Sequence, residues 1–383
     1  MSTQTLADLA EALARIAPPA LAEDWDNVGL LLGDPSWAIG PGPVVVAIDL
    51  TRAVMGEAIA AKASAIVAYH PPLFTPTKRI TSNDRAGTTV LECAARKIGI
   101  ISPHTALDAA PGGLADWLLD QCGPSGAAWT DRQALTASRS AGSAAGFKVV
   151  TFVPLAQVDA VADAMARAGA GVIGQYTHCS YRVDGTGTFF GGEETNPAVG
   201  SKGELEHVGE MRLEMVSTGR ALADVVAALR AAHPYEEPAF DVYALAPKPD
   251  RSIGAGRIGS LGAPEPARNL VARLAMRLGV ASMQLAGDPN VMVRRVAVCP
   301  GSGGSLAEAA AAGGADLFVT GEMSHHGQLA SLERGCAVAL AGHTETERPY
   351  MPVLAQRILK AGVMCEVIVA KQDRTPLTSV PAR

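Results

Sequence analysis

The sequence is poor in aromatic residues, in paired cysteines and in long apolar runs. Phenylalanine, tryptophan and tyrosine make up 4% of its 383 residues, whereas alanine and glycine are abundant. Small residues of this kind favour helices packed closely on sheets over an all-β sandwich, so we expect an α/β fold. The chain is longer than one ordinary core accommodates, which predicts two or more domains.

These absences also exclude classes of protein. No run approaches the roughly 20 apolar residues of a membrane helix, and the N-terminal segment lacks the pattern of a signal peptide. The six cysteines show no CxxC or other paired spacing, so we interpret them as buried free thiols of a cytoplasmic protein. A net charge of −6 gives no general attraction to nucleic acid or to an anionic membrane, and we expect neither as a partner.

Short β-branched runs alternate with helical stretches in the first third of the chain. Residues 44–50 and 65–70 are predicted to be buried strands that end in polar residues, with a helical stretch between them. Residues 86–97 predict another helix, followed by a third strand. The carboxyl ends of parallel strands line the ligand crevice in such folds. The residues expected at this edge are Tyr69, His70, His104 and Asp108.

The middle of the chain has the pattern of a separate module. Residues 126–145 are rich in glycine, serine and alanine, which indicates a linker or an irregular edge. Residues 146–250 follow the order strand, helix, strand, strand, helix, strand of a ferredoxin-like domain, in which we interpret His233 as structural. We therefore predict an α/β/α body formed by residues 1–125 and 251–383, with a ferredoxin-like α+β domain inserted between them.

Polar residues at the strand ends suggest a metal site. His70, Asp108 and His343 each follow a buried strand, and Glu347 lies four residues after His343 at an expected helix start. Its carboxylate can therefore reach the same point and bridge two cations. Imidazole and carboxylate donors suit zinc, manganese, iron or cobalt, and hydrolytic centres commonly use this mixture. The alternative is that each residue has an ordinary structural role, which spacing alone leaves open.

Six motifs extend this pattern over both ends of the chain. They are WDNVGL (25–30), YHPPLF (69–74), HTALDAAPGG (104–113), GSGGS (301–305), TGEMSHH (320–326) and GHTETER (342–348). In this order, the set resembles the dinuclear-metal-centre hexameric protein family, also called GTP cyclohydrolase 1 type 2-like. The resemblance covers residues 1–125 and 251–383.

The resemblance implies a ligand set and an assembly. The positions that match the family's ligands for two divalent transition-metal ions per subunit (zinc, iron, manganese or cobalt) are His70, Asp108, His343 and Glu347. Tyr69 departs from many members, which have histidine there, so one ion is expected to be held less tightly or through water. The resemblance also implies a homohexameric toroid and, through HPYEEPAFDVY (233–243), an insert similar to CutA and nitrogen-regulatory proteins.

Neighbouring residues have weaker assignments. His325 and His326 follow a predicted strand end, and we predict that one of them is a general acid or base. His104 either orients a ligand or has a loop role, and residues 25–27 either shape a pocket wall or form a turn. The GSGGS loop could hold a phosphate through its N–H groups, but a tight turn is the better interpretation.

Two functions fit these expectations. The first is metal-dependent hydrolysis of a nucleotide or a related phosphate-bearing small molecule, which the family's cyclohydrolase label suggests. The second is a non-enzymatic role in metal binding, metal delivery or regulation, with the insert gating access to the metals. A ring that encircles nucleic acid is a third idea, and the acidic net charge counts against it.

Overall fold

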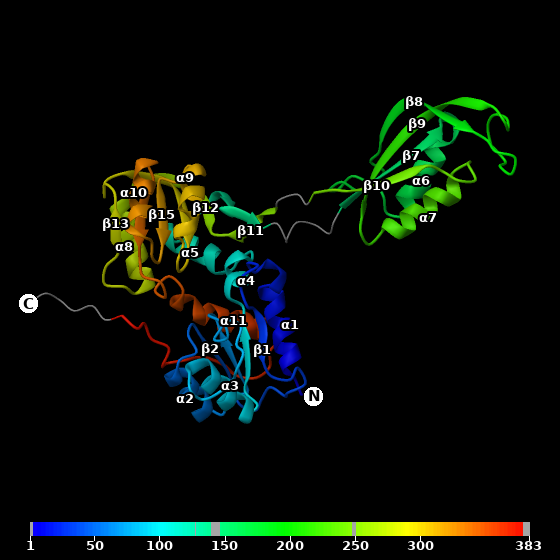
Figure 1. Cartoon of the computed structure of the whole chain (residues 1–383). Helices are drawn as coiled ribbons and strands as arrows, with labels where there is room; N and C mark the ends of the chain where they lie inside the picture. The colour runs from blue at the N-terminus through cyan, green and yellow to red at the C-terminus, as the bar shows by residue number, and fades with distance from the viewer. Residues whose placement is uncertain (1–2, 127, 139–145, 247–249, 378–383) are drawn as a thin grey trace, which may run out of the picture. The chain divides into compact units, whose positions relative to one another are not determined.

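The chain forms two compact units that both combine helices with sheets (Figure 1). The computed structural model describes residues 3–126, 128–138, 146–246 and 250–377. One unit comprises Met1–Ala141 and Asp250–Arg383, and the other comprises Gly142–Pro249. The α/β class expected from the sequence is confirmed.

The first unit contains a five-stranded sheet with the order β1-β4-β3-β2-β17. Its strands are β1 (Gly29–Leu32), β4 (Gly99–Ser102), β3 (Ala65–Ala68), β2 (Val44–Ala47) and β17 (Val367–Val369). All neighbours are parallel except β1, which pairs antiparallel with β4. Since β17 comes from the C-terminal segment and the other strands from the N-terminal one, the sheet joins both ends of the chain.

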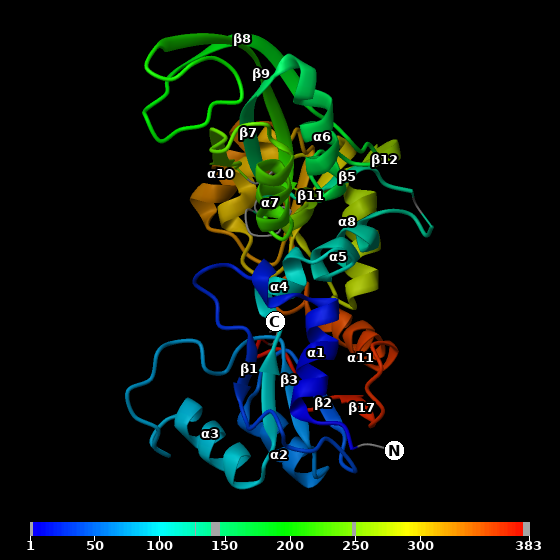
Figure 2. The same ribbon diagram turned by 90° about the vertical axis from the view of Figure 1, so that its right-hand side faces the viewer.

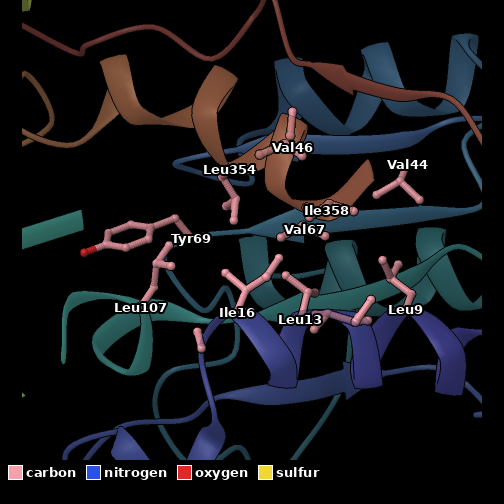
Figure 3. Packing of buried hydrophobic residues seen from close by; sticks show 14 of the residues in the cluster. Leu9, Leu13, Ile16, Val44, Val46, Val67, Tyr69, Leu107, Leu354 and Ile358 are labelled. Carbon is pink, nitrogen blue, oxygen red and sulfur yellow. The ribbon is translucent and has the colours of Figure 1, made fainter. Parts of the chain in front are cut away.

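Helices cover both faces of this sheet because its strands are apolar on both sides (Figure 2). They are α1 (Leu6–Ile16), α11 (Met351–Lys360), α2 (Arg52–Ala60) and α3 (Arg85–Ala95). Val44 and Val46 face α1 and α11, whereas Val45 and Ala47 face α2, as the two-residue period of a strand requires. Figure 3 shows Leu13 of α1 and Leu354 of α11 in the same cluster.

A second, six-stranded sheet in this unit has the order β13-β16-β15-β14-β12-β5. Its strands are β13 (Gln284–Ala286), β16 (Ala337–Leu340), β15 (Leu317–Thr320), β14 (Met292–Cys299), β12 (Arg257–Pro266) and β5 (Thr130–Gln133). Strands β14, β15 and β16 are parallel and the outer ones antiparallel. Helices α5 (Leu114–Cys122), α8 (Ala267–Leu278), α9 (Ala307–Ala312) and α10 (His325–Glu333) pack in this half, whereas α4 (His104–Ala109) packs in the core of the first sheet.

The segment predicted as a linker, 126–145, contains strands where it is described. Strand β5 pairs with β12, and β6 (Thr136–Ser138) pairs with β11 (Asp250–Ala255). Residues 127 and 139–145 lie outside the described residues. The described part of this segment therefore agrees with the second interpretation, an irregular edge, because an edge strand takes its conformation from the strand it pairs with more than from its own composition.

A buried guanidinium joins the N-terminal and C-terminal parts of this unit. Arg257 of β12 is 1% exposed, and its Nε donates to Asp116 Oδ1 of α5 at 3.0 Å. Its Nη2 donates to the carbonyls of Ala109 and Ala110 at the end of α4. Its Nη1 donates to the carbonyls of Gly254 in β11 and of Gly256, which connects β11 to β12. A charge this deeply buried is tolerated because its hydrogen bonds are made.

We expect Arg257→Met to lower the free energy of unfolding of this unit by about 3–5 kcal/mol, because it removes the buried cation that donates to Asp116 Oδ1 and to four carbonyls. All four tryptophans belong to this unit, so urea unfolding followed by tryptophan emission measures the effect. Arg334→Met is the matched control, since Arg334 is about half exposed and should cost under about 1 kcal/mol. Equal losses in the two variants would contradict the structural role of Arg257.

The second unit is a four-stranded antiparallel sheet with two helices. Its elements in chain order are β7 (Gly146–Pro154), α6 (Val158–Arg167), β8 (Tyr181–Phe190), β9 (Leu205–Thr218), α7 (Leu222–Ala232) and β10 (Phe240–Ala244). The sheet order is β10-β7-β9-β8, and apolar residues of α6 and α7 pack on β7 and β9. This is the β-α-β-β-α-β element order expected from the sequence.

His233 fixes the turn after α7 in this unit. The side chain is buried, its Nε2 donates to the Phe152 carbonyl of β7 at 2.9 Å, and its Nδ1 accepts from the backbone N–H of Tyr235 at 3.1 Å. This pattern needs the neutral imidazole with its proton on Nε2. Burial lowers the pKa of His233 below 6.5, against the opposing hydrogen bond to Phe152.

The depressed pKa of His233 predicts acid sensitivity of this unit. The unfolded chain binds a proton at His233 near pH 6.5 and the folded chain only at lower pH, so stability is complete above pH 6.5 and falls below it. One proton contributes at most about 1.4 kcal/mol per pH unit. Urea unfolding followed by circular dichroism between pH 7.5 and 5.5 measures the loss, while tryptophan emission follows the other unit. His233→Gln should flatten the dependence, and an unchanged slope in this variant would refute the assignment.

Candidate metal centre

Polar side chains gather where the parallel strands of both sheets end. His70 follows β3, and His343 follows β16. Glu347 lies between β16 and the short helix Arg348–Tyr350 that leads into α11. Because α11 packs on the first sheet, the segment after β16 connects the end of the second sheet to the end of the first. Carboxyl ends of parallel strands are where α/β folds place their ligands.

Three of the four predicted ligands converge. Glu347 is 2% exposed, and its two carboxylate oxygens face different imidazoles: Oε2 lies 3.5 Å from His70 Nε2, and Oε1 lies 3.5 Å from His343 Nε2. One donor atom from each of the three residues lies within 4.8 Å of the others. This is the donor set that could hold a metal ion.

Two further carboxylates orient the imidazoles. His70 Nδ1 donates to Asp49 Oδ1 at 3.0 Å, and His343 Nδ1 donates to Glu322 Oε1 at 2.8 Å, so each Nε2 is directed at Glu347. Carboxylates in this position commonly fix the tautomer of metal-binding histidines. Burial acts to lower the pKa of His70, but Asp49 and Glu347 outweigh it and raise the pKa to about 10. The surroundings therefore favour positive charge at this point.

Two observations indicate that these residues fit a cation. Within the described residues, the buried Glu347 Oε2 accepts no hydrogen bond, although buried carboxylate oxygens normally have partners. Gly301, at φ +62°, leaves space beside the donors: a Cβ there would lie 2.5 Å from Glu347 Oε1 and 3.1 Å from His343 Nε2. An ion about 2.0–2.2 Å from nitrogen and oxygen donors would satisfy Glu347.

The fourth predicted ligand, Asp108, lines the same cavity and is hydrogen-bonded to Tyr69, and its role as a ligand stays a prediction. The Tyr69 hydroxyl donates to Asp108 Oδ1 at 2.7 Å, and Asp108 is not in the three-residue group. Burial raises the pKa of Asp108 to about 7 against the opposing effect of this hydrogen bond. Burial, and then the charges of Asp108 and Glu347, also raise the pKa of Tyr69, so its hydroxyl keeps the proton that it donates.

These residues line a cavity of about 700 Å³ in the first unit. Trp25, Phe74 and His104 form part of its wall, with the rings of Trp25 and Phe74 5.9 Å apart, edge to face. Asp26 accepts from His104 Nδ1 at 2.7 Å, with Thr105 bonded to its other oxygen. Residues 25–27 were interpreted either as part of a pocket wall or as a turn. Trp25 lies in the pocket wall, whereas Asp26 fixes the His104 imidazole through a hydrogen bond.

The other predicted residues lie less centrally. The N–H groups of Gly301 and Gly303 donate to the hydroxyls of Thr346 and Thr320, which favours the tight turn over a phosphate site in the GSGGS loop. His325 and His326 are exposed on the first turn of α10 and do not line this cavity. Their catalytic role stays a prediction.

Asp49 was missed in reasoning from the sequence. It directly follows the apolar run VVVAI, which is the same signal that identified His70 and His343. Glu322 lies behind His343 and does not line the cavity.

The chain is similar to known proteins along nearly its whole length. The family model Duf34/NIF3 (NGG1p interacting factor 3) matches residues 4–376. The GTP cyclohydrolase 1 type 2 homolog of Mycobacterium tuberculosis is 41% identical over 323 residues, 84% of this chain and 82% of that protein. The Halalkalibacterium halodurans protein of the same name is 33% identical over 379 residues, 99% of this chain and 95% of that protein.

Solved structures show the same fold. A Bacillus cereus protein related to NIF3 has a TM-score of 0.67 at 29% identity, and a Staphylococcus aureus protein, SA1388, has 0.74 at 24%. Both alignments cover 99% of this chain and 100% of the other. None of the helices in the described ranges combines the length and the apolarity that a membrane crossing requires.

Fold and site together define an α/β protein with a histidine and carboxylate donor set at the strand ends of two sheets. The chain belongs to the Duf34/NIF3 family. The family resemblance of the motifs is thereby confirmed, while the hexamer and the likeness of the insert to CutA stay predictions.

We expect Glu322→Ala to weaken metal binding by about 10- to 100-fold, because His343 loses the carboxylate that directs its Nε2. Competition between the protein and a fluorescent chelator for zinc measures the affinity. Glu333→Ala is the control, since Glu333 is an exposed glutamate at the far end of α10. Wild-type affinity in Glu322→Ala would show that this hydrogen bond does not prepare the site.

Proposed function

We propose that this protein is a divalent-metal-dependent hydrolase of a nucleotide or a related phosphate-bearing small molecule. The observation that carries the proposal is Glu347, a buried carboxylate that faces His70 and His343 in the wall of a large cavity. This donor set suits zinc, iron, manganese or cobalt. Such an ion, when bound, polarises a substrate and activates water.

The protein's own residues would hold the ion and orient the substrate. His70, His343 and Glu347 supply the donors, and the Asp49 and Glu322 carboxylates keep the two imidazoles in place. His104 is held through Nδ1 by Asp26, which leaves its Nε2 for a substrate or for proton transfer. Its ring centroid is 5.4 Å from that of His70, so both imidazoles serve one reacting group.

The cavity wall supports a substrate with a planar ring. Trp25 and Phe74 both line the cavity. They are large apolar side chains, yet they are 61% and 49% exposed. Aromatic side chains of this kind stack on nucleobases. The names of the relatives, GTP cyclohydrolase 1 type 2 homologs, point to the same class of compound.

Hydrolysis of nucleoside triphosphates by protein loaded separately with zinc, manganese, iron or cobalt tests the proposal. Chromatography of the products and release of phosphate identify the bond that is broken. Glu347→Gln should reduce kcat/KM by about 100-fold or more, since the bound metal contributes several kcal/mol to such reactions. Trp25→Ala should raise KM by about 5- to 150-fold, the range of one stacking interaction.

Glu333→Gln serves as the control and should keep wild-type turnover. If fully loaded protein turns over no nucleotide, or if Glu347→Gln is as active as wild type, the hydrolase proposal is wrong. Transfer of the metal to an acceptor protein without turnover would favour the delivery function instead.

A further inference from the structure

A buried carboxylate in the C-terminal segment, that of Asp373, contacts the segments that carry the candidate metal donors. Its side chain is 2% exposed, and it follows β17, the strand that pairs with β2 (Figure 2). The chain before Asp373 is fixed to α2, because the N–H groups of Lys371 and Gln372 donate to the Glu57 carboxylate at 2.9 and 2.8 Å. Asp373 therefore has a defined place at the carboxyl end of β2.

The Asp373 carboxylate holds the residues that support His70. Its Oδ2 accepts from the backbone N–H of Ile48 at 2.7 Å, and its Oδ1 accepts a long hydrogen bond, of 3.5 Å, from the N–H of Asp49. The Ile48 carbonyl in turn accepts from the His70 N–H at 3.0 Å, and the Asp49 carboxylate accepts from His70 Nδ1. Asp373 thus holds the partners of both the backbone and the imidazole of His70.

The same carboxylate also holds the residue next to Glu347. The guanidinium of Arg348 pairs with Asp373 Oδ1, and its side chain is 22% exposed. The contact is an ion pair without hydrogen-bond geometry, since the buried Nη atoms of Arg348 have no hydrogen-bond partner among the described residues. Arg348 directly follows Glu347 and begins the short helix that leads to α11. The ion pair therefore ties the Glu347 segment to Asp373.

The separation of His70 and Glu347 decides whether both can bind one ion. Glu347 Oε2 lies 3.5 Å from His70 Nε2, and an ion needs each atom at about 2.0–2.2 Å. The two residues come from the N-terminal and C-terminal parts of the chain, so contacts between their supporting segments set this separation. The Asp373 carboxylate makes contacts with both segments, and a displacement of either would lengthen one of the two bonds to the ion.

We propose that Asp373 is a positioning residue of the metal centre. It sets the separation of His70 and Glu347, because it holds Asp49 on one side and Arg348 on the other. The Asp373 carboxylate does not line the cavity, so it acts through these residues and not as a ligand. The inference rests on the metal centre of the proposed function, but not on the reaction that this centre catalyses.

Zinc affinity of the full chain tests this inference. Asp373→Asn keeps an oxygen that can accept from the Ile48 N–H but removes the charge that pairs with Arg348. We expect zinc binding, measured by competition with a fluorescent chelator, to weaken by about 10-fold, the lower end of the range for groups that orient metal ligands. Arg348→Gln should have a similar effect. The double variant should lose no more than either single variant, because both changes break one link.

Glu265→Gln is the matched control. Glu265 pairs with Arg273 in the same unit, their side chains are 20% and 21% exposed, and neither lines the cavity. This variant loses a partly buried ion pair and should keep wild-type zinc affinity.

The visible absorption of cobalt-loaded protein separates positioning from a loss of stability. At saturating cobalt, a changed arrangement of donors alters the absorption bands, whereas a less stable fold with the same donors does not. Asp373→Asn and Arg348→Gln should alter the bands, and Glu265→Gln should leave them unchanged.

Wild-type zinc affinity or an unaltered cobalt spectrum in Asp373→Asn would overturn the inference and leave the metal centre itself intact. An equal loss of zinc affinity in Glu265→Gln, or additive losses in the double variant, would overturn it too. If wild type binds neither zinc nor cobalt, the proposed function is wrong as well. Should Asp373→Asn fail to fold, Arg348→Gln decides the question by the same two measurements, because it breaks the same ion pair.

Discussion

The arrangement of the first unit depends on the buried, positively charged guanidinium of Arg257. Through Asp116 and the carbonyls of Ala109 and Ala110, it holds the end of α4 and the start of α5 against β12. Asp108 immediately precedes Ala109, and β12 belongs to the sheet whose parallel strands lead to His343. The guanidinium thus fixes the N-terminal half of the site relative to the C-terminal half, and fully satisfied hydrogen bonds make that position rigid.

With the two halves fixed, negative charge accumulates around two imidazoles. Asp49 and Glu322 lie behind His70 and His343, and the buried Glu347 lies between them. Such a concentration of carboxylates favours a cation and would be costly in a site built only for stability. The charge distribution and the space beside Gly301 therefore both support the metal site proposed for this cavity.

Much of the candidate metal site could be predicted from the sequence, because the end of a strand is a local feature. The apolar runs before His70 and His343 place both residues at the edge of a sheet, and the four-residue spacing to Glu347 brings its carboxylate to the same point. The hydrogen bond between Tyr69 and Asp108 could not be predicted, since it depends on how α4 packs against β3. The hydrogen bonds of Arg257 could not be predicted either, because Asp116, Ala109 and Ala110 all lie more than 140 positions away from it in the sequence.

The buried carboxylate of the site lowers the stability of the folded chain. Within the described residues the buried Glu347 Oε2 accepts no hydrogen bond, and an unsatisfied buried acceptor destabilises the fold. A cation that binds the folded chain and not the unfolded one removes this cost and adds its own binding free energy to stability. Binding of the proposed cation would consequently be coupled to folding of the first unit. The second unit has its own core, built from apolar residues of α6, α7, β7 and β9, and its stability does not depend on this coupling.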